Sequence, residues 1–284
     1  MIDLDVLRIA LRALTYVGSI AAAGGVLFAL SFPRAADTIR SDIERQVLVG
    51  CCLLLIIEPA RYVAFQLAIS GGDWSRAFGP EMRGLAMQTP MGQAAITRVI
   101  GAVAILVLPS RMVASRASAA LVMIASFAFE GHTASSETRT ALGTSALLIH
   151  VMAVHWWLGA LYPLLALTRS AEPARLGAAA ETFGRQAIWI VAALLVGGVP
   201  VLTILTGAQL NLESPYQQRF LLKVVLVAVL LSIAAWNKLR LTPLLRRDPE
   251  NGRTKLRRSI KAEILVGLLI LVTTAWALNS SPEG

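Results

Sequence analysis

The chain has 284 residues, of which 56% are hydrophobic and 15% are charged, and its formal net charge is +9. The charged fraction is about half to two-thirds of that in an ordinary soluble domain, so there are too few polar residues to cover a soluble core of this size. Two cysteines and the lack of a glycine repeat exclude a disulfide-rich scaffold and a collagen-like chain. The composition predicts an all-α, polytopic membrane protein, and the positive charge then bears on topology rather than on nucleic acid.

Eight stretches are long and apolar enough to cross a bilayer, which takes roughly 20 helical residues. Apolar runs of this length do not fit the alternating strands of a membrane β-barrel, so a helix is expected for each. The first stretch has no small-residue cleavage site and is taken as a span rather than a signal peptide. We expect one transmembrane domain over residues 1–284, with spans at 8–32, 47–70, 91–109, 113–129, 141–167, 183–207, 219–236 and 260–278.

The basic residues are distributed unevenly between the two sides. Of the 26 Lys and Arg residues, 17 lie on one side: 14 in the connections that follow the first, third, fifth and seventh spans, and three, Arg116, Arg185 and Lys261, in the first turn of the span that comes next. Positive charge is retained on the cytoplasmic side of bacterial inner-membrane proteins. The distribution therefore predicts that these four connections are cytoplasmic and that both termini are periplasmic, although Arg8 and Arg12 run against it.

Two connections are long. The outer one, 71–90, carries large apolar side chains and is expected to form a short helix at the membrane interface. The inner one, 241–254, contains two prolines and an Asn-Gly pair, so it is expected to be rich in turns. The basic residues around the inner connection predict an anchor to anionic lipids, with the docking of a partner as the alternative.

Three histidines, His132, His150 and His155, are the only ones in the chain and fall within 24 residues. Polar groups at membrane depth are costly, so they are candidates for function. On an ideal helix His150 and His155 point about 140° apart, and Met152 can share the side of His155. His150 would then need ligands from another span or from His132. The alternative is that the three histidines only hold helices together through hydrogen bonds.

Sulfur-containing side chains could extend such a site. Met87 and Met91, with Met82, lie near the outer interface, and thioether and imidazole groups suit Cu(I). Cys51 and Cys52 near the cytoplasmic end of the second span could bind the ion as it leaves. Ordinary packing is the alternative for the methionines and for the cysteines.

Five further polar residues lie within or next to the spans. Glu58 and Arg61 are spaced to form an ion pair on one helix face. Arg98 and Lys223 either snorkel to the outer interface or face the bundle and hold an anion. Asn237 is expected to cap the seventh span at its inner end.

Several segments, in their order and spacing, resemble the CopD/PcoD family of copper-resistance membrane proteins. In the segment that ends in Trp157-Leu158-Gly159, His150 stands at the position of the family's histidine, whereas His155 is an addition. Gln217 replaces a usual glycine, and the first span lacks the histidine that many members carry. The segments that carry the resemblance are 89–98, 131–134, 148–159, 215–240 and 256–263.

The resemblance implies a copper-handling protein of the bacterial inner membrane that works beside a periplasmic copper-binding partner of the CopC type. It favours a transporter or binding protein over an enzyme, with copper bound by the histidines and methionines. No nucleotide-binding motif is present, so neither nucleotide nor nucleic acid is an expected partner. The alternative is a redox protein that holds a b-type haem between two histidines and reacts with quinol or copper. A subunit without a ligand is the third possibility.

Overall fold

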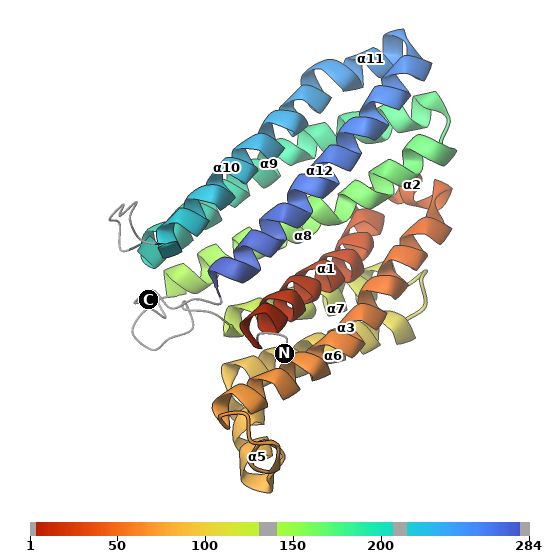
Figure 1. Cartoon of the computed structure of the whole chain (residues 1–284). Helices are drawn as coiled ribbons and strands as arrows, with labels where there is room; N and C mark the ends of the chain where they lie inside the picture. Colours follow the sequence, from red (N-terminus) through yellow and green to blue (C-terminus); the bar gives the residue numbers. More distant parts are fainter. Residues whose placement is uncertain (1–3, 131–140, 207–214, 279–284) are drawn as a thin grey trace.

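The structure is a computed structural model that describes residues 4–130, 141–206 and 215–278, and all regular structure in these ranges is helical (Figure 1). Seven helices are long and apolar enough to cross a membrane, and the shorter segment Val113–Phe129 is an eighth candidate. The predicted all-α membrane fold is confirmed. The α-helices are α1 (Leu4–Ser31), α2 (Pro33–Thr38), α3 (Arg40–Ile69), α4 (Trp74–Ala77), α5 (Pro80–Gln88), α6 (Pro90–Val107), α7 (Val113–Ala125), α8 (Ala141–Ser170), α9 (Pro173–Thr206), α10 (Pro215–Trp236), α11 (Thr242–Arg247) and α12 (Pro249–Ala277); η1 (Ser126–Phe129) is a 3₁₀-helix and η3 (Asn237–Leu241) a π-helix.

Several helices are longer than the apolar stretches that predicted them. The helix α3 begins at Arg40 rather than at residue 47, and α12 begins at Pro249 rather than at residue 260. Hydropathy marks the part of a helix that suits hydrocarbon, whereas the backbone hydrogen bonds continue until a cap or a proline stops them. The polar first turns of these helices therefore extend past the apolar core.

The prediction of a turn-rich connection over 241–254 is wrong. The helix α10 continues through the π-turn η3 into α11, and α12 follows directly after Asp248. Pro243 and Pro249 both stand in the first turn of a helix, where the missing N–H of proline costs nothing. The Asp248 carboxylate accepts a hydrogen bond from the backbone N–H of Asn251 and so caps α12.

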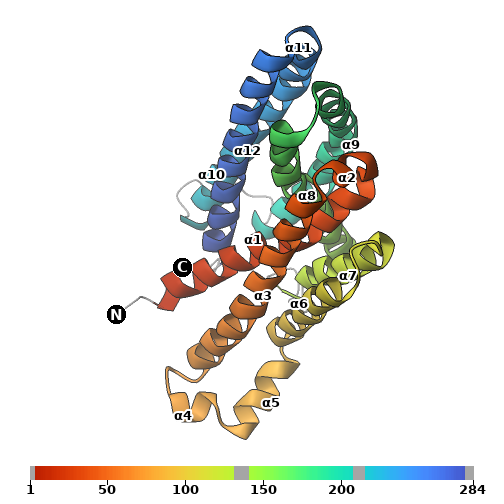
Figure 2. The same cartoon turned by 90° about the vertical axis from the view of Figure 1, so that its right-hand side faces the viewer.

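Two groups of helices are joined through α1 and α8 (Figures 1 and 2). The helices α3, α6 and α7 lie on one side, and α9, α10 and α12 lie on the other. At the crossing of α1 and α8 a Cβ added to Gly159 would lie 2.3 Å from the Cα of Gly24. Gln46 of α3 joins both helices, because its Nε2 donates to the carbonyls of Ala21 and Gly159 at 3.1 Å each. Small residues permit this close approach of helices.

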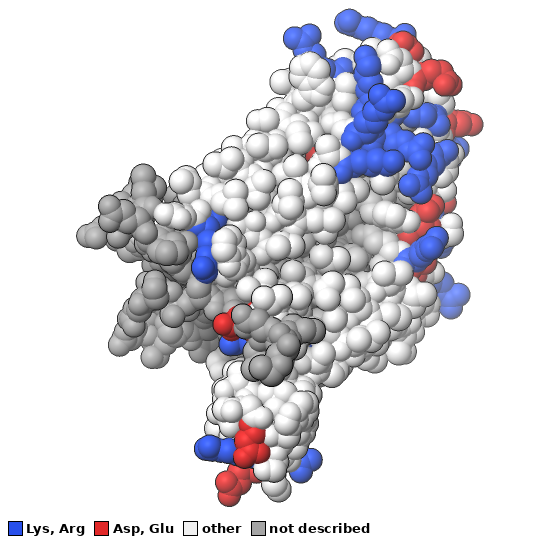
Figure 3. Space-filling view, viewed as in Figure 1, with Lys and Arg blue, Asp and Glu red and all other residues white. Residues whose placement is uncertain are grey.

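Lys and Arg side chains gather at one end of the bundle, around α11 and the first turns of α12 (Figure 3). The helix α1 begins and α12 ends at the opposite end (Figure 1). The positive-inside rule places such a basic end in the cytoplasm. The basic end is called the cytoplasmic end below, and the opposite end is called the outer end.

The outer connection 71–90 forms two short helices, α4 and α5, which project from the bundle (Figure 2). Asp73 caps α4, and the hydrogen bond from the Ser75 hydroxyl holds the pKa of Asp73 below its ordinary value. Trp74 and Leu85 are 62% and 58% exposed. Exposed apolar side chains of this size fit a position at the membrane interface.

Candidate functional site

Four charged side chains form a buried cluster in the outer half of the first group of helices. They are Glu58 and Arg61 of α3, Arg98 of α6 and Glu130, which directly follows η1. Arg61 Nη1 and Arg98 Nε lie 3.3 Å and 3.0 Å from the same oxygen, Glu58 Oε1, and Glu130 pairs with both arginines. The side chains of Glu58 and Arg98 are 0% exposed. At this depth the charges depend on one another for compensation.

Neutral groups complete the cluster. The Thr15 hydroxyl of α1 donates to Glu58 at 2.8 Å, and Arg98 Nη1 donates to the Ser126 hydroxyl at 3.3 Å. Arg98 Nε pairs with Glu58 by charge only, since its geometry is not that of a hydrogen bond; Nη2 makes the hydrogen bond, at 3.2 Å. The guanidinium of Arg98 also lies 4.9 Å from the centre of the Phe127 ring. Arg98 therefore faces the bundle, and the anions that it holds belong to the chain itself.

His155 lies on the face of α8 that packs against α1. Its Nε2 lies 3.1 Å from the Ser19 hydroxyl and its Nδ1 lies 2.8 Å from the carbonyl of Val151. His155 is 3% exposed, and the centre of its ring lies 5.6 Å from that of Phe127. Both ring nitrogens thus have protein partners, which is the pattern of a histidine that joins helices.

His150 faces α9 and α10 instead. Its Nδ1 lies 3.4 Å from the carbonyl of Leu194, and a Cβ added to Gly198 would lie 3.1 Å from the same nitrogen. Its Nε2 makes no hydrogen bond to the residues that the structure describes. Lys223 of α10 lies close enough to interact electrostatically with the ring. The two histidines of α8 therefore point to different helices, as their spacing on the helix requires.

The methionines that were predicted as ligands lie on three helices. Met82 and Met87 are on α5, where Met87 is 53% exposed, and Met91 stands in the first turn of α6. Met152 is on α8 and is partly buried against the hydrophobic core. Within the described parts of the chain, no three His, Cys, Asp or Glu side chains are grouped to hold a metal ion.

The two cysteines do not share surroundings. Cys51 is fully buried, whereas the neighbouring Cys52 is exposed on the surface of the bundle. Both are free thiols. A copper site that uses both thiols at the cytoplasmic end would require one of the two side chains to change its direction. The predicted ligand His132 lies outside the residues that the structure describes.

Asn237 does not cap a helix, contrary to the prediction, because α10 continues through η3. Its Nδ2 instead donates to Glu263 Oε1 of α12 at 2.6 Å. Glu263 is 2% exposed, and none of the ion pairs found in the described residues includes it. Asn237 thus links the seventh span to the last one.

Sequence reasoning missed two acidic residues, Glu130 and Glu263. A count of charges would have indicated Glu130, because Arg61, Arg98 and Glu58 together leave one buried positive charge without a counterion. Glu263 is the only acidic residue in the apolar stretch 260–278. An isolated acidic residue in a span is itself a signal of function or of a specific contact.

Comparison with known proteins connects this architecture to copper. The family model described as "Copper resistance protein D-like, N-terminal domain" matches residues 1–144, and the model "Copper resistance protein D" matches residues 177–277. The chain belongs to the copper resistance protein D family. The first match covers the helices that hold the ionic cluster, and the second covers most of α9 and α10 to α12.

Two relatives match along most of their length. Copper resistance protein D of Pseudomonas syringae pv. tomato is 27% identical, over 98% of this chain and 98% of the relative. Inner membrane protein YebZ of Escherichia coli (strain K12) is 25% identical, over 77% of this chain and 80% of the relative. No solved structure matches. Together with the apolar helices, these relationships identify a copper-related, multi-pass protein of the inner membrane.

Proposed function

We propose that the protein binds copper that arrives from the periplasm and moves it across the inner membrane, with His150 as the central ligand. Family membership supports copper as the substrate. The observation that carries the choice of residue is the contrast between the two histidines of α8. Both ring nitrogens of His155 are occupied by protein groups, whereas Nε2 of His150 has no hydrogen bond to a described residue. A neutral imidazole nitrogen of this kind is a good copper ligand.

His132 is the proposed partner of His150. It follows Glu130 by two residues, and Glu130 is held by ion pairs to Arg61 and Arg98. The chain therefore leaves η1 from a fixed point on the way to α8. The ionic cluster, in this proposal, does not bind copper itself, because its charges already compensate one another.

Copper is proposed to reach this site from the outer end by way of methionine thioethers. Met87 is exposed on the projecting helix α5, and Met91 stands where the chain enters α6. Thioethers bind Cu(I) in preference to the hard cations of the periplasm. A periplasmic copper-binding protein of the CopC type would release its ion to this projecting part of the chain.

Lys223 would keep the affinity at His150 moderate. Its positive charge lies close enough to interact with the ring and opposes a bound cation. Transport requires a site that binds strongly enough to take up the ion and weakly enough to release it. No nucleotide-binding motif is recognised in the sequence, so an ion gradient or transfer to an acceptor would drive the movement.

The basic end supports a second part of the proposal, an anchor to anionic lipids. A hollow beside η3 is lined by Arg240, Lys255, Arg258 and Trp236. Cationic side chains beside an aromatic ring at the cytoplasmic surface suit phosphate headgroups. Phosphatidylglycerol, but not phosphatidylcholine, should raise the melting temperature of the purified protein, and the rise should shrink in Arg258→Ala. Equal effects of both lipids would contradict the anchor.

The test of transport is uptake of copper into proteoliposomes that contain a fluorescent Cu(I) chelator. The wild-type protein should accelerate uptake over protein-free vesicles, and His150→Ala should abolish the acceleration. His155→Ala, if it retains its helical content, serves as the matched control and should keep most of the uptake. Wild-type vesicles that take up copper no faster than empty ones would refute transport, and full uptake by His150→Ala would refute the assigned ligand.

A further inference from the structure

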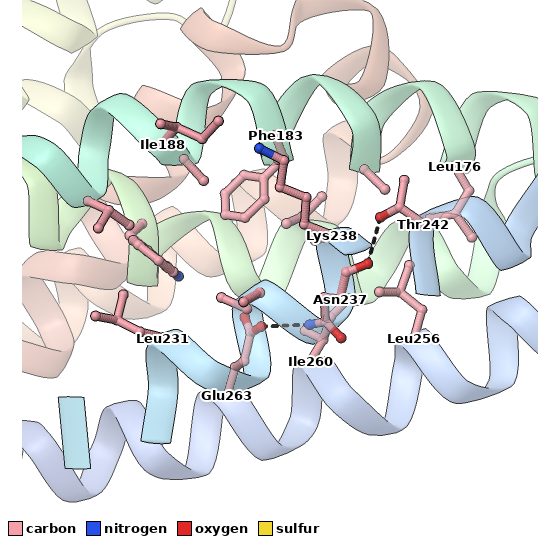
Figure 4. Close-up of a pocket in the computed structure, with 18 residues that line it drawn as sticks. Leu176, Phe183, Ile188, Leu231, Asn237, Lys238, Thr242, Leu256, Ile260 and Glu263 are labelled. Atoms are coloured by element: carbon pink, nitrogen blue, oxygen red, sulfur yellow. Dashed lines mark hydrogen bonds between the residues drawn. The ribbon is translucent and has the colours of Figure 1, made fainter. Parts of the chain in front are cut away.

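A cavity of about 310 Å³ lies between α8, α9, α10 and α12, in the cytoplasmic half of the second group of helices (Figure 4). Its lining is mostly aliphatic and aromatic and includes Phe183, Leu231 and Ile260. Its volume is at the lower end of the range for small-molecule sites, which are typically apolar with a few convergent polar groups. Close packing is the rule in protein interiors, so a cavity of this size needs an explanation.

Three polar side chains line the cavity with buried atoms that are not fully hydrogen-bonded. Trp157 is 2% exposed, and its Nε1 has no partner within the described parts of the chain; the same is true of Asn237 Oδ1. The Glu263 carboxyl accepts a hydrogen bond from Asn237 Nδ2, as Figure 4 shows. Buried polar groups that lack partners are rare, because each loses its hydrogen bonds to water without replacement. Besides the side chain of Lys238, the cavity thus offers one unused donor and two acceptors.

A local irregularity of the backbone begins at Asn237. The π-turn η3 begins at Asn237, and the Thr242 hydroxyl donates to its carbonyl oxygen at 3.0 Å. A π-turn inside a regular helix is unfavourable and is found mostly at functional sites. The residue at which the regular hydrogen bonding of α10 ends is thus the one that contacts Glu263.

The cavity reaches the lipid-facing surface between α9 and α10. The helix α9 packs on α8, and α10 packs on α12. The main contacts of α9 with the segment from α10 to α12 are made at η3 and α11. Ile188 of α9 lines the cavity and is 55% exposed. An opening at this position faces hydrocarbon rather than water, so it would admit a lipophilic molecule.

We propose that this cavity binds the headgroup of a membrane quinone or quinol. The indole N–H of Trp157 would donate to a quinone oxygen, and Asn237 Oδ1 or the Glu263 carboxyl would accept from a quinol hydroxyl. The aromatic rings of Trp157 and Phe183 suit a flat ring. Glu263 and Lys238 both line the cavity, so it presents no net charge to an anionic lipid headgroup, whereas a neutral ring suits the mostly apolar lining. The proposal concerns binding alone and stands independently of the copper site at His150.

Titration with decylubiquinone tests the proposal in the purified protein. Saturable quenching of tryptophan fluorescence and a rise in melting temperature are expected for the wild type. Trp157→Phe should lose most of the quenching, whereas Trp189→Phe is the matched control, because Trp189 is on α9 and 78% exposed. Asn237→Leu should weaken binding about tenfold, or ~1.4 kcal/mol.

Two further measurements separate binding in the cavity from partition into detergent. Ala187→Trp places a large side chain in the cavity and should abolish the rise in melting temperature while the ligand-free protein stays folded. Dodecylbenzene, which lacks the oxygen atoms, should produce no rise in the wild type. A wild-type protein without a saturable response, or an equal response in Ala187→Trp, would show that the cavity holds only water or detergent and would overturn the proposal.

Discussion

Replacement of Glu58 by glutamine tests whether the ionic cluster is a single charge-balanced unit. Glu58 accepts from Thr15 at 2.8 Å and compensates Arg61 and Arg98, and its side chain is 0% exposed. In Glu58→Gln two buried arginines face one carboxylate, that of Glu130. Removing one partner of a buried pair costs about 3–5 kcal/mol, so the melting temperature should fall by the order of 10 °C.

Thermal unfolding in detergent, followed by intrinsic fluorescence, measures this loss. The matched control is Glu181→Gln, which removes the same charge from the pair of Glu181 with Arg246, whose side chains are 46% and 70% exposed. Exposed pairs contribute about 0–1 kcal/mol, so the control should shift by no more than about 2 °C. A fall in Glu58→Gln that is no larger than in the control would refute the reasoning.

A double variant separates charge balance from the loss of packing. Glu58→Gln with Arg61→Gln leaves Arg98 and Glu130, which already pair directly. Neutrality is restored, so the double variant should melt above Glu58→Gln although one more native group is missing. Destabilisation equal to the sum of the two single variants would mean that the residues act independently and that charge balance is unimportant.

Three further predictions concern the copper site and the topology. Gly198→Ala places a Cβ 3.1 Å from His150 Nδ1 and should lower copper affinity in an equilibrium titration against a Cu(I) chelator, with little change in melting temperature; an unchanged affinity would count against His150. Lys223→Gln removes a repelling charge and should raise the affinity in the same titration, by about tenfold, whereas a lower affinity would show that the lysine supports the site. In a background without Cys51 and Cys52, a thiol reagent that does not cross the membrane should label Ser75→Cys but not Asn251→Cys, and the reverse pattern would invert the topology.

The membrane fold follows from the sequence because hydrocarbon imposes a length and a composition on each span. The segment 113–129 was recognised even though it is shorter than the other spans. The ends of the helices could not be predicted from hydropathy, since capping residues and the position of prolines decide them. Pro249 shows this well: it reads as part of a turn in isolation, but it begins α12 behind the cap at Asp248.

The site was only partly predictable for a different reason. The i, i+3 spacing of Glu58 and Arg61 indicated their ion pair, because both are on one helix. The contacts of Arg98 with Glu58 and of His155 with Ser19 join residues from different helices, and helical periodicity carries no information on which faces meet. Likewise, helical geometry predicted the angle between His150 and His155, but it could not predict which residues of other helices contact them.

Copper bound per protein at equilibrium tests the central claim most directly. Wild type, His150→Ala and His155→Ala are purified without metal, loaded with Cu(I) in the presence of a competing chelator and assayed by elemental analysis, with a visible spectrum to detect haem. Loss of bound copper in His150→Ala and retention in His155→Ala, with no haem absorption in any of the three, is the predicted result. Full occupancy in His150→Ala, or a haem band that disappears with this substitution, would contradict the proposed copper site.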